Sequence, residues 1–117
     1  MLNSLLTSGS VISGTYYPNF FRLGNSRISL DAIPPERMGL HGEYDHNGLA
    51  GRVRYQCSQV FGLDAISQLK IRQRGSVVVL YGCVPSKALL ERILRLAIQA
   101  EGATSVELRG VEIGSNR

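Results

Sequence analysis

The feature that most constrains the fold is the stretch from Arg74 to Ser86, which reads RGSVVVLYGCVPS. A run of β-branched and aromatic residues entered through a Gly-Ser pair is typical of a strand that leaves a tight hairpin turn. Pro85 ends this strand, and Ser86 offers a side-chain oxygen that caps the free N–H groups of a following helix. We therefore expect a strand, a turn and a helix from Lys87 to Glu101, ended by Gly102.

Residues 66 to 74 alternate between apolar and polar side chains, as a strand with one buried face does. Leu69 and Ile71 lie on one side, and the other side carries Lys70, Arg72 and Arg74. A turn at Gly75-Ser76 pairs this strand antiparallel with the next, so that Ile71 faces Leu80 or Val78. The two apolar sides match in either register.

Two further elements complete the expected fold. An apolar stripe at helical spacing predicts a helix that ends at Gly62, and its members are Leu49, Val53, Cys57, Val60 and Phe61. Residues 105 to 113 predict a last strand, which the helix crossover places in the same sheet. The prediction is an α+β domain of order αββαβ, with a three-stranded mixed sheet and two helices packed on one face.

The chain before this domain has no sustained period, and we expect residues 1–44 to be an irregular arm, 45–113 the domain and 114–117 a frayed tail. Within the arm, residues 27–30 could make one short strand. Four aromatic residues fall within six positions, which favours their docking on an apolar surface. They are Tyr16, Tyr17, Phe20 and Phe21.

Composition sets limits on partners and location. A net charge of +4 over 117 residues favours acidic partners. Cys57 and Cys83 are too few for a disulfide framework and lack the spacing of a CxxC motif, so we interpret them as small core residues in a reducing compartment. No signal-peptide pattern and no apolar run of about 20 residues is present, and we expect a cytoplasmic protein, with peripheral attachment to a membrane left open.

Chemistry-bearing motifs are few. Four residues of metal-ligating type fall close together: His41, Glu43, Asp45 and His46. The preferred interpretation is a polar loop that leads into a helix, with Asp45 or Asn47 as the N-cap. No catalytic triad spacing, paired catalytic carboxylates, phosphate-binding loop or dinucleotide fingerprint is present. We expect no enzyme activity, no cofactor and no metal.

The run Val78-x-Leu80-x-Gly82-x-Val84, taken with the order of the elements, resembles the BON domain, a small bacterial αββαβ module. The resemblance covers about residues 47–113, with 49–61 as the first helix and matches at Gly102 and Val106. It departs at the turn glycine, which is displaced by one residue to Gly75, and at Leu108, where the family often has Asn.

The resemblance implies a fold and a non-enzymatic role. The family includes phospholipid-binding members and members that serve as attachment modules. We accordingly consider binding of a protein partner or of a second copy first, and binding of an anionic membrane surface as the alternative. Nucleic-acid binding is the third candidate, because Tyr81 lies among basic residues in a way that superficially resembles a stacking platform.

Two surfaces are expected to carry these interactions. The apolar positions of the helix at 87–101 spread over about 200°, so if Leu89, Ile93, Leu96 and Ala100 face the sheet, Leu94 and Ile98 are left over. On the other sheet face, apolar residues lie beside basic ones, and helix 49–61 adds two arginines. The candidate binding residues are Arg52, Arg54, Lys70, Arg72, Arg74, Val77, Val79, Tyr81, Leu94 and Ile98. As an alternative to an external partner, the aromatic residues of the arm could fold back and cover one of these two surfaces.

Overall fold

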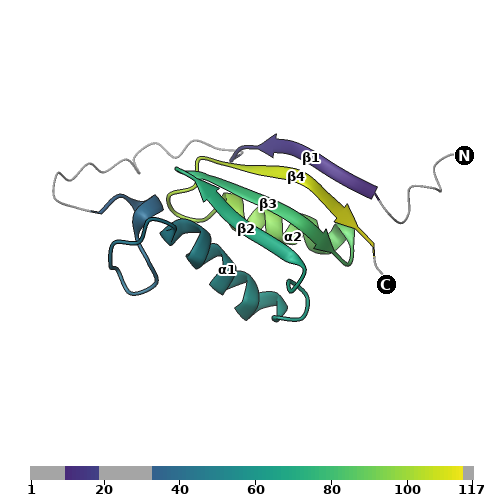
Figure 1. Cartoon of the computed structure of the whole chain (residues 1–117), viewed down its shortest axis with the longest axis horizontal. Helices are drawn as coiled ribbons and strands as arrows, with labels where there is room; N and C mark the ends of the chain where they lie inside the picture. Colours follow the sequence, from purple (N-terminus) through teal and green to yellow (C-terminus); the bar gives the residue numbers. More distant parts are fainter. Residues whose placement is uncertain (1–9, 19–32, 115–117) are drawn as a thin grey trace, which may run out of the picture.

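A computed structural model describes residues 10–18 and 33–114 of the chain. These residues form a four-stranded mixed sheet, two α-helices on one face of it and a short 3-10 helix at one end (Figure 1). In chain order the elements are β1 (Ser10–Tyr16), η2 (Pro35–Arg37), α1 (Gly48–Phe61), β2 (Leu69–Arg74), β3 (Val77–Val84), α2 (Lys87–Ile98) and β4 (Ser105–Ile113).

The expected three-stranded sheet is wrong, because the strand order is β1-β4-β3-β2. The extra strand, β1, comes from the arm that we expected to be irregular, and it pairs antiparallel with β4. Its register shifts between Ile12 and Gly14. Because of this irregularity, and because Gly14 has no side chain, the sequence of β1 does not show the alternation of apolar and polar residues that is typical of a strand. The short strand expected at 27–30 lies outside the described residues.

The predicted hairpin and crossover are confirmed. Arg74 pairs with Val77 across the Gly75-Ser76 turn, and Ile71 pairs with Leu80, so both apolar sides face the helices. From β3 the chain passes through α2 to β4, which pairs parallel with β3. Ser86 Oγ accepts a hydrogen bond from Leu89 N at 3.1 Å, which confirms the expected cap of α2.

The core lies between the sheet and the helices. From α1 it receives Leu49, Val53 and Cys57, all fully buried, whereas Val60 at the end of the predicted stripe is exposed. On α2 the buried stripe is centred on Leu90, Ile93 and Ala97 rather than on Leu89 and Leu96. The difference arises because α2 has apolar side chains on both flanks, so its sequence does not fix which flank faces the sheet.

The segment 33–47, mostly assigned to the arm, packs against the first helix. Arg52 of α1 donates hydrogen bonds to the carbonyl oxygens of Met38, at 2.8 Å, and Pro35. Met38 in turn forms an isolated bridge with Tyr44. Gly48, the first residue of α1, lies so close to Met38 that a Cβ would come within 2.3 Å of its carbonyl oxygen. This segment is therefore part of the packed structure.

Among the residues that the structure describes, no helix has the length and hydropathy needed to cross a membrane.

Candidate binding surface

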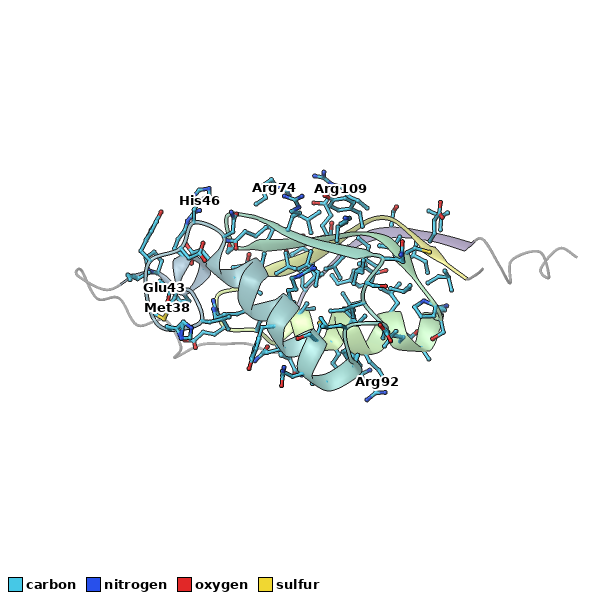
Figure 2. The ribbon with its side chains drawn as sticks, turned by 60° about the horizontal axis from the view of Figure 1, so that its bottom comes forward. Met38, Glu43, His46, Arg74, Arg92 and Arg109 are labelled. Carbon is cyan, nitrogen blue, oxygen red and sulfur yellow. The ribbon has the colours of Figure 1, made fainter. Side chains whose placement is uncertain are left out.

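The sheet face opposite the helices, called the outer face below, carries the expected basic residues. Lys70, Arg72 and Arg74 are exposed on β2, and alternation along the strand turns them away from Leu69 and Ile71 in the core. Both helices lie on the other side of the sheet, and Figure 2 shows Arg74 on the outer side and Arg92 of α2 on the opposite side. No described helix covers the outer face.

Register places an apolar row beside these basic residues. Lys70 pairs with Tyr81, Arg72 with Val79 and Arg74 with Val77, so the three residues of β3 point to the outer face as expected. These three residues are less exposed than expected, since Val79 is only 5% exposed, and Val77 and Tyr81 are half-buried. The centre of the outer face is therefore a narrow apolar strip between charged side chains.

Strand β4 adds two charged residues that the sequence-based site omitted. Glu107 accepts a hydrogen bond from Arg74 Nη1 at 2.9 Å and one from Arg109 Nε at 3.0 Å. The bonds from Arg74 and Arg109 lower the pKa of the Glu107 carboxyl, which is thus ionised at neutral pH. Alternation with buried Val106 and Leu108 was the signal in the sequence that places these two residues on the outer face.

These residues surround a shallow depression on the outer face. Its volume is about 660 Å³, and it is lined by Arg72, Gln73, Arg74, Val79, Tyr81 and Arg109. Three guanidinium groups over a floor of valine and tyrosine favour an anionic ligand with some apolar surface.

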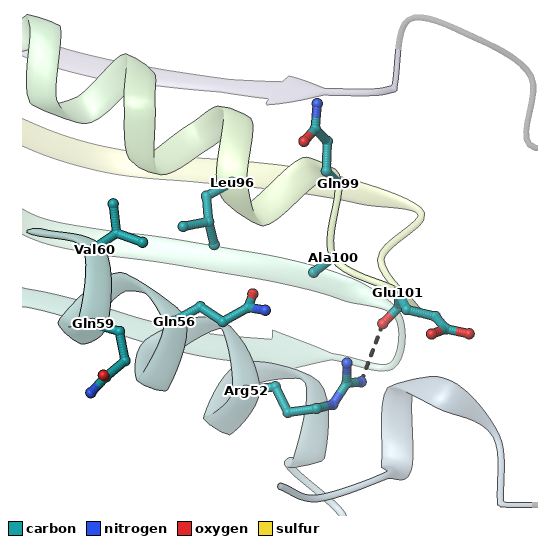
Figure 3. A pocket seen from close by; sticks show the side chains of 8 residues that line it. All are labelled: Arg52, Gln56, Gln59, Val60, Leu96, Gln99, Ala100 and Glu101. Carbon is teal, nitrogen blue, oxygen red and sulfur yellow. Dashed lines mark hydrogen bonds between the residues drawn. The ribbon is translucent and has the colours of Figure 1, made fainter.

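The two arginines predicted on α1 lie in different places. Arg54 is exposed and shares a depression with Lys70 and Arg72 at the β2 edge of the sheet, so it joins the basic residues. Arg52 lies apart from these basic residues, at the groove between the two helices. It also donates to the Glu101 carbonyl oxygen at 3.2 Å (Figure 3), so its guanidinium ties α1 to the turn after α2.

The patch that we expected to remain uncovered on α2 is half-buried. Leu94 and Ile98 pack against the core and line a groove of about 380 Å³. Strand β1 and the residues after it form the opposite wall, through Tyr16, Tyr17 and Pro18. Part of the aromatic arm therefore lies beside this patch within the same chain.

A second groove, of about 500 Å³, separates the two helices (Figure 3). Its apolar lining comes from Val60, Leu96 and Ala100, and the other lining residues are three glutamines, Arg52 and Glu101. Arg52 donates to three backbone carbonyl oxygens, so part of its hydrogen-bonding capacity is used within the chain. We do not assign this groove a function.

The candidate metal ligands do not converge in the structure. Among the described residues, no group of three His, Cys, Asp or Glu side chains is placed to share a metal ion. Glu43 Oε1 accepts from the backbone N–H of His41 at 2.9 Å, and Arg37 Nη1 contacts the ring of His46. The expected cap also differs, because Asn47 gives α1 no side-chain bond and Gln73 Oε1 accepts from Ala50 N instead, at 2.8 Å.

Both cysteines are free thiols. Cys57 is fully buried, and burial raises the pKa of its thiol to about 11. Cys83 is half-buried at the end of β3. Cys57 is thus the small core residue that the sequence predicts, and it is protonated at neutral pH.

The fold and the outer face together define a small α+β domain with a mixed sheet, two helices on one side and a charged open face on the other. In comparisons with known proteins, no family model and no curated protein matches the chain.

Proposed function

We propose that this chain is a non-enzymatic binding module that engages an acidic protein partner through the outer face. The observation that carries the proposal is the gathering of four cations on that face around one apolar strip. These cations are Lys70, Arg72, Arg74 and Arg109. Two carboxylates offset part of their charge: Glu107, and Asp45 in the neighbouring depression that Lys70 and Arg72 also line. A surplus of positive charge remains.

The unused hydrogen-bond donors support this proposal. Lys70 and Arg72 form no side-chain hydrogen bond or ion pair with any other described residue, although Arg74 and Arg109 both do. Guanidinium and ammonium groups without an internal carboxylate remain available to carboxylates of a partner. An apolar strip within a polar rim is the usual arrangement of a protein interface.

The proposal includes membership of the BON type. The helix, strand, strand, helix, strand order over residues 48–113 agrees with the resemblance drawn from the sequence. Gly82 of the resembling motif also has a physical role, since its φ is +110° and a Cβ would come within 2.3 Å of the Gln68 carbonyl oxygen. A cytoplasmic location belongs to the same proposal and is supported by the two free thiols.

Peripheral binding to an anionic phospholipid surface is the second candidate. It is favoured by the exposed cations Arg54, Lys70 and Arg72, which lie together at the β2 edge. Each cation near an anionic leaflet contributes on the order of 1 kcal/mol, so three give a weak and salt-sensitive attachment. The protein partner is preferred because the wider set of cations surrounds an apolar strip on a sheet face rather than at one edge.

The test is binding of a labelled peptide that alternates glutamate and serine, measured by fluorescence anisotropy at low salt and at ~0.15 M salt. We expect the double variant Lys70→Glu, Arg72→Glu to abolish binding at low salt. The matched control is Arg92→Glu with Arg95→Glu on α2, which changes the net charge equally but on the helix side of the sheet, where Figure 2 labels Arg92. This control should retain most binding.

Equal losses in both double variants would contradict the outer face as the binding site. Cosedimentation with phosphatidylserine vesicles tests the second candidate. Vesicle binding that is lost in the first variant, without peptide binding by the wild type, would favour a membrane surface over a protein partner.

A further inference from the structure

Glu107 is the only acidic side chain that forms an ion pair among the described residues, and it pairs twice. Its two carboxylate oxygens accept hydrogen bonds from different strands: Oε1 from Arg74 of β2 and Oε2 from Arg109 of β4. Glu107 pairs in register with Val79 of β3, which lies between those strands. One carboxylate thus holds two guanidinium groups over the apolar strip.

We propose that Glu107 is an internal competitor of the partner's acidic side chains, and that a partner carboxylate replaces it on Arg74 and Arg109. This inference rests on the proposed function. It identifies the preferred ligand as a segment with enough carboxylates to displace Glu107, so a sparsely charged surface is rejected. Specificity is a difference of affinities, and breaking the two Glu107 ion pairs is a cost that a ligand with few carboxylates does not recover.

The exposure of the three side chains makes the exchange feasible. The side chains of Arg74 and Arg109 are 59% and 57% exposed, whereas that of Glu107 is 23% exposed. A guanidinium has five N–H donors, and each arginine uses one of them on Glu107. The free donors therefore face solvent, where a ligand can reach them before Glu107 leaves. Solvent-exposed ion pairs are weak, so a second carboxylate can replace the first at small cost.

The spacing of the cations favours an extended acidic segment as the ligand. Lys70, Arg72 and Arg74 are two residues apart along β2, which separates their side chains by about 6.6 Å. An extended segment that alternates glutamate with a small polar residue presents its carboxylates with the same spacing. The alternating glutamate and serine peptide is the probe for this reason.

The experiment compares Glu107→Gln with Glu112→Gln in binding of this peptide at low salt. Glu112 is an exposed residue of β4 outside the Arg74 and Arg109 pairs, so its variant has the same net charge and controls for that change. We expect Glu107→Gln to bind roughly two- to fivefold more tightly than wild type, and to exceed Glu112→Gln. A peptide with glutamine at every glutamate should bind neither variant.

Other results overturn the inference in distinguishable ways. If Glu107→Gln binds no more tightly than Glu112→Gln, the competitor role is wrong while the proposed function stands. If Glu107→Gln binds more weakly than wild type, Glu107 is a positioning residue for the arginines, and the competitor role is again wrong. If no protein binds the peptide at low salt, the proposed function fails and the inference fails with it. Circular dichroism of each variant confirms that the sheet is intact.

Discussion

At the scale of the residue, close backbone contacts explain positions that sequence patterns leave unassigned. Gly48 opens α1 against the backbone of Met38, and Gly102 packs against η2 with a φ of +98°. The sequence predicts that Gly102 ends a helix in a left-handed conformation. Its φ is positive as predicted, but α2 itself ends earlier, at Ile98. The contact with η2 was not predictable, because it joins residues far apart in the chain.

Two glycines of α1 test the close contact between Gly48 and Met38. Gly48→Ala should lower the free energy of unfolding by about 1–3 kcal/mol, because the new Cβ must displace the Met38 carbonyl group. Gly51→Ala should raise it by about 0.5–1 kcal/mol, since Gly51 is exposed with open space around it and alanine favours helix. Urea unfolding measures both, and equal effects would argue against the packing of 33–47 on α1.

At the scale of the element, alternation and helical period predict most of the domain. The hairpin, the parity of β2 against β3, and the span of β4 follow from residues that lie on one buried face. Strand β1 was missed because Ser13 and Gly14 interrupt its pattern, and its stability depends on pairing with β4, a contact of long range. The sequence did not determine which side of α2 faces the sheet, because its apolar residues cover more of the helix surface than one buried stripe.

Arg52 and Arg54 are two residues apart on α1, and the structure gives them different roles. Arg52→Gln should lower the free energy of unfolding by about 1–3 kcal/mol, because the carbonyl groups of Pro35, Met38 and Glu101 lose a charged donor. Arg54→Gln should change it by less than about 0.5 kcal/mol, since Arg54 is exposed. Urea unfolding of the two variants is a direct comparison, and a larger loss for Arg54→Gln would contradict the assignment.

At the scale of the whole molecule, the two sides of the sheet differ in composition. One side builds the core with α1 and α2, and the other presents charges around Val79. Three of the four basic residues of this outer face, those on β2, could be predicted from that strand alone. The contribution of β4 required the parallel pairing that brings Glu107 and Arg109 beside β3, and the role of Arg52 required its long-range bonds.

The most direct test of this account is to map the amide chemical shifts of the ¹⁵N-labelled chain during titration with the alternating glutamate and serine peptide. We expect the perturbed residues to cluster on the outer face, at Lys70, Arg72, Tyr81 and Arg109, while the helices change little. Perturbations that cluster in the groove between α1 and α2, or around His41 to His46, would contradict the outer face as the binding surface.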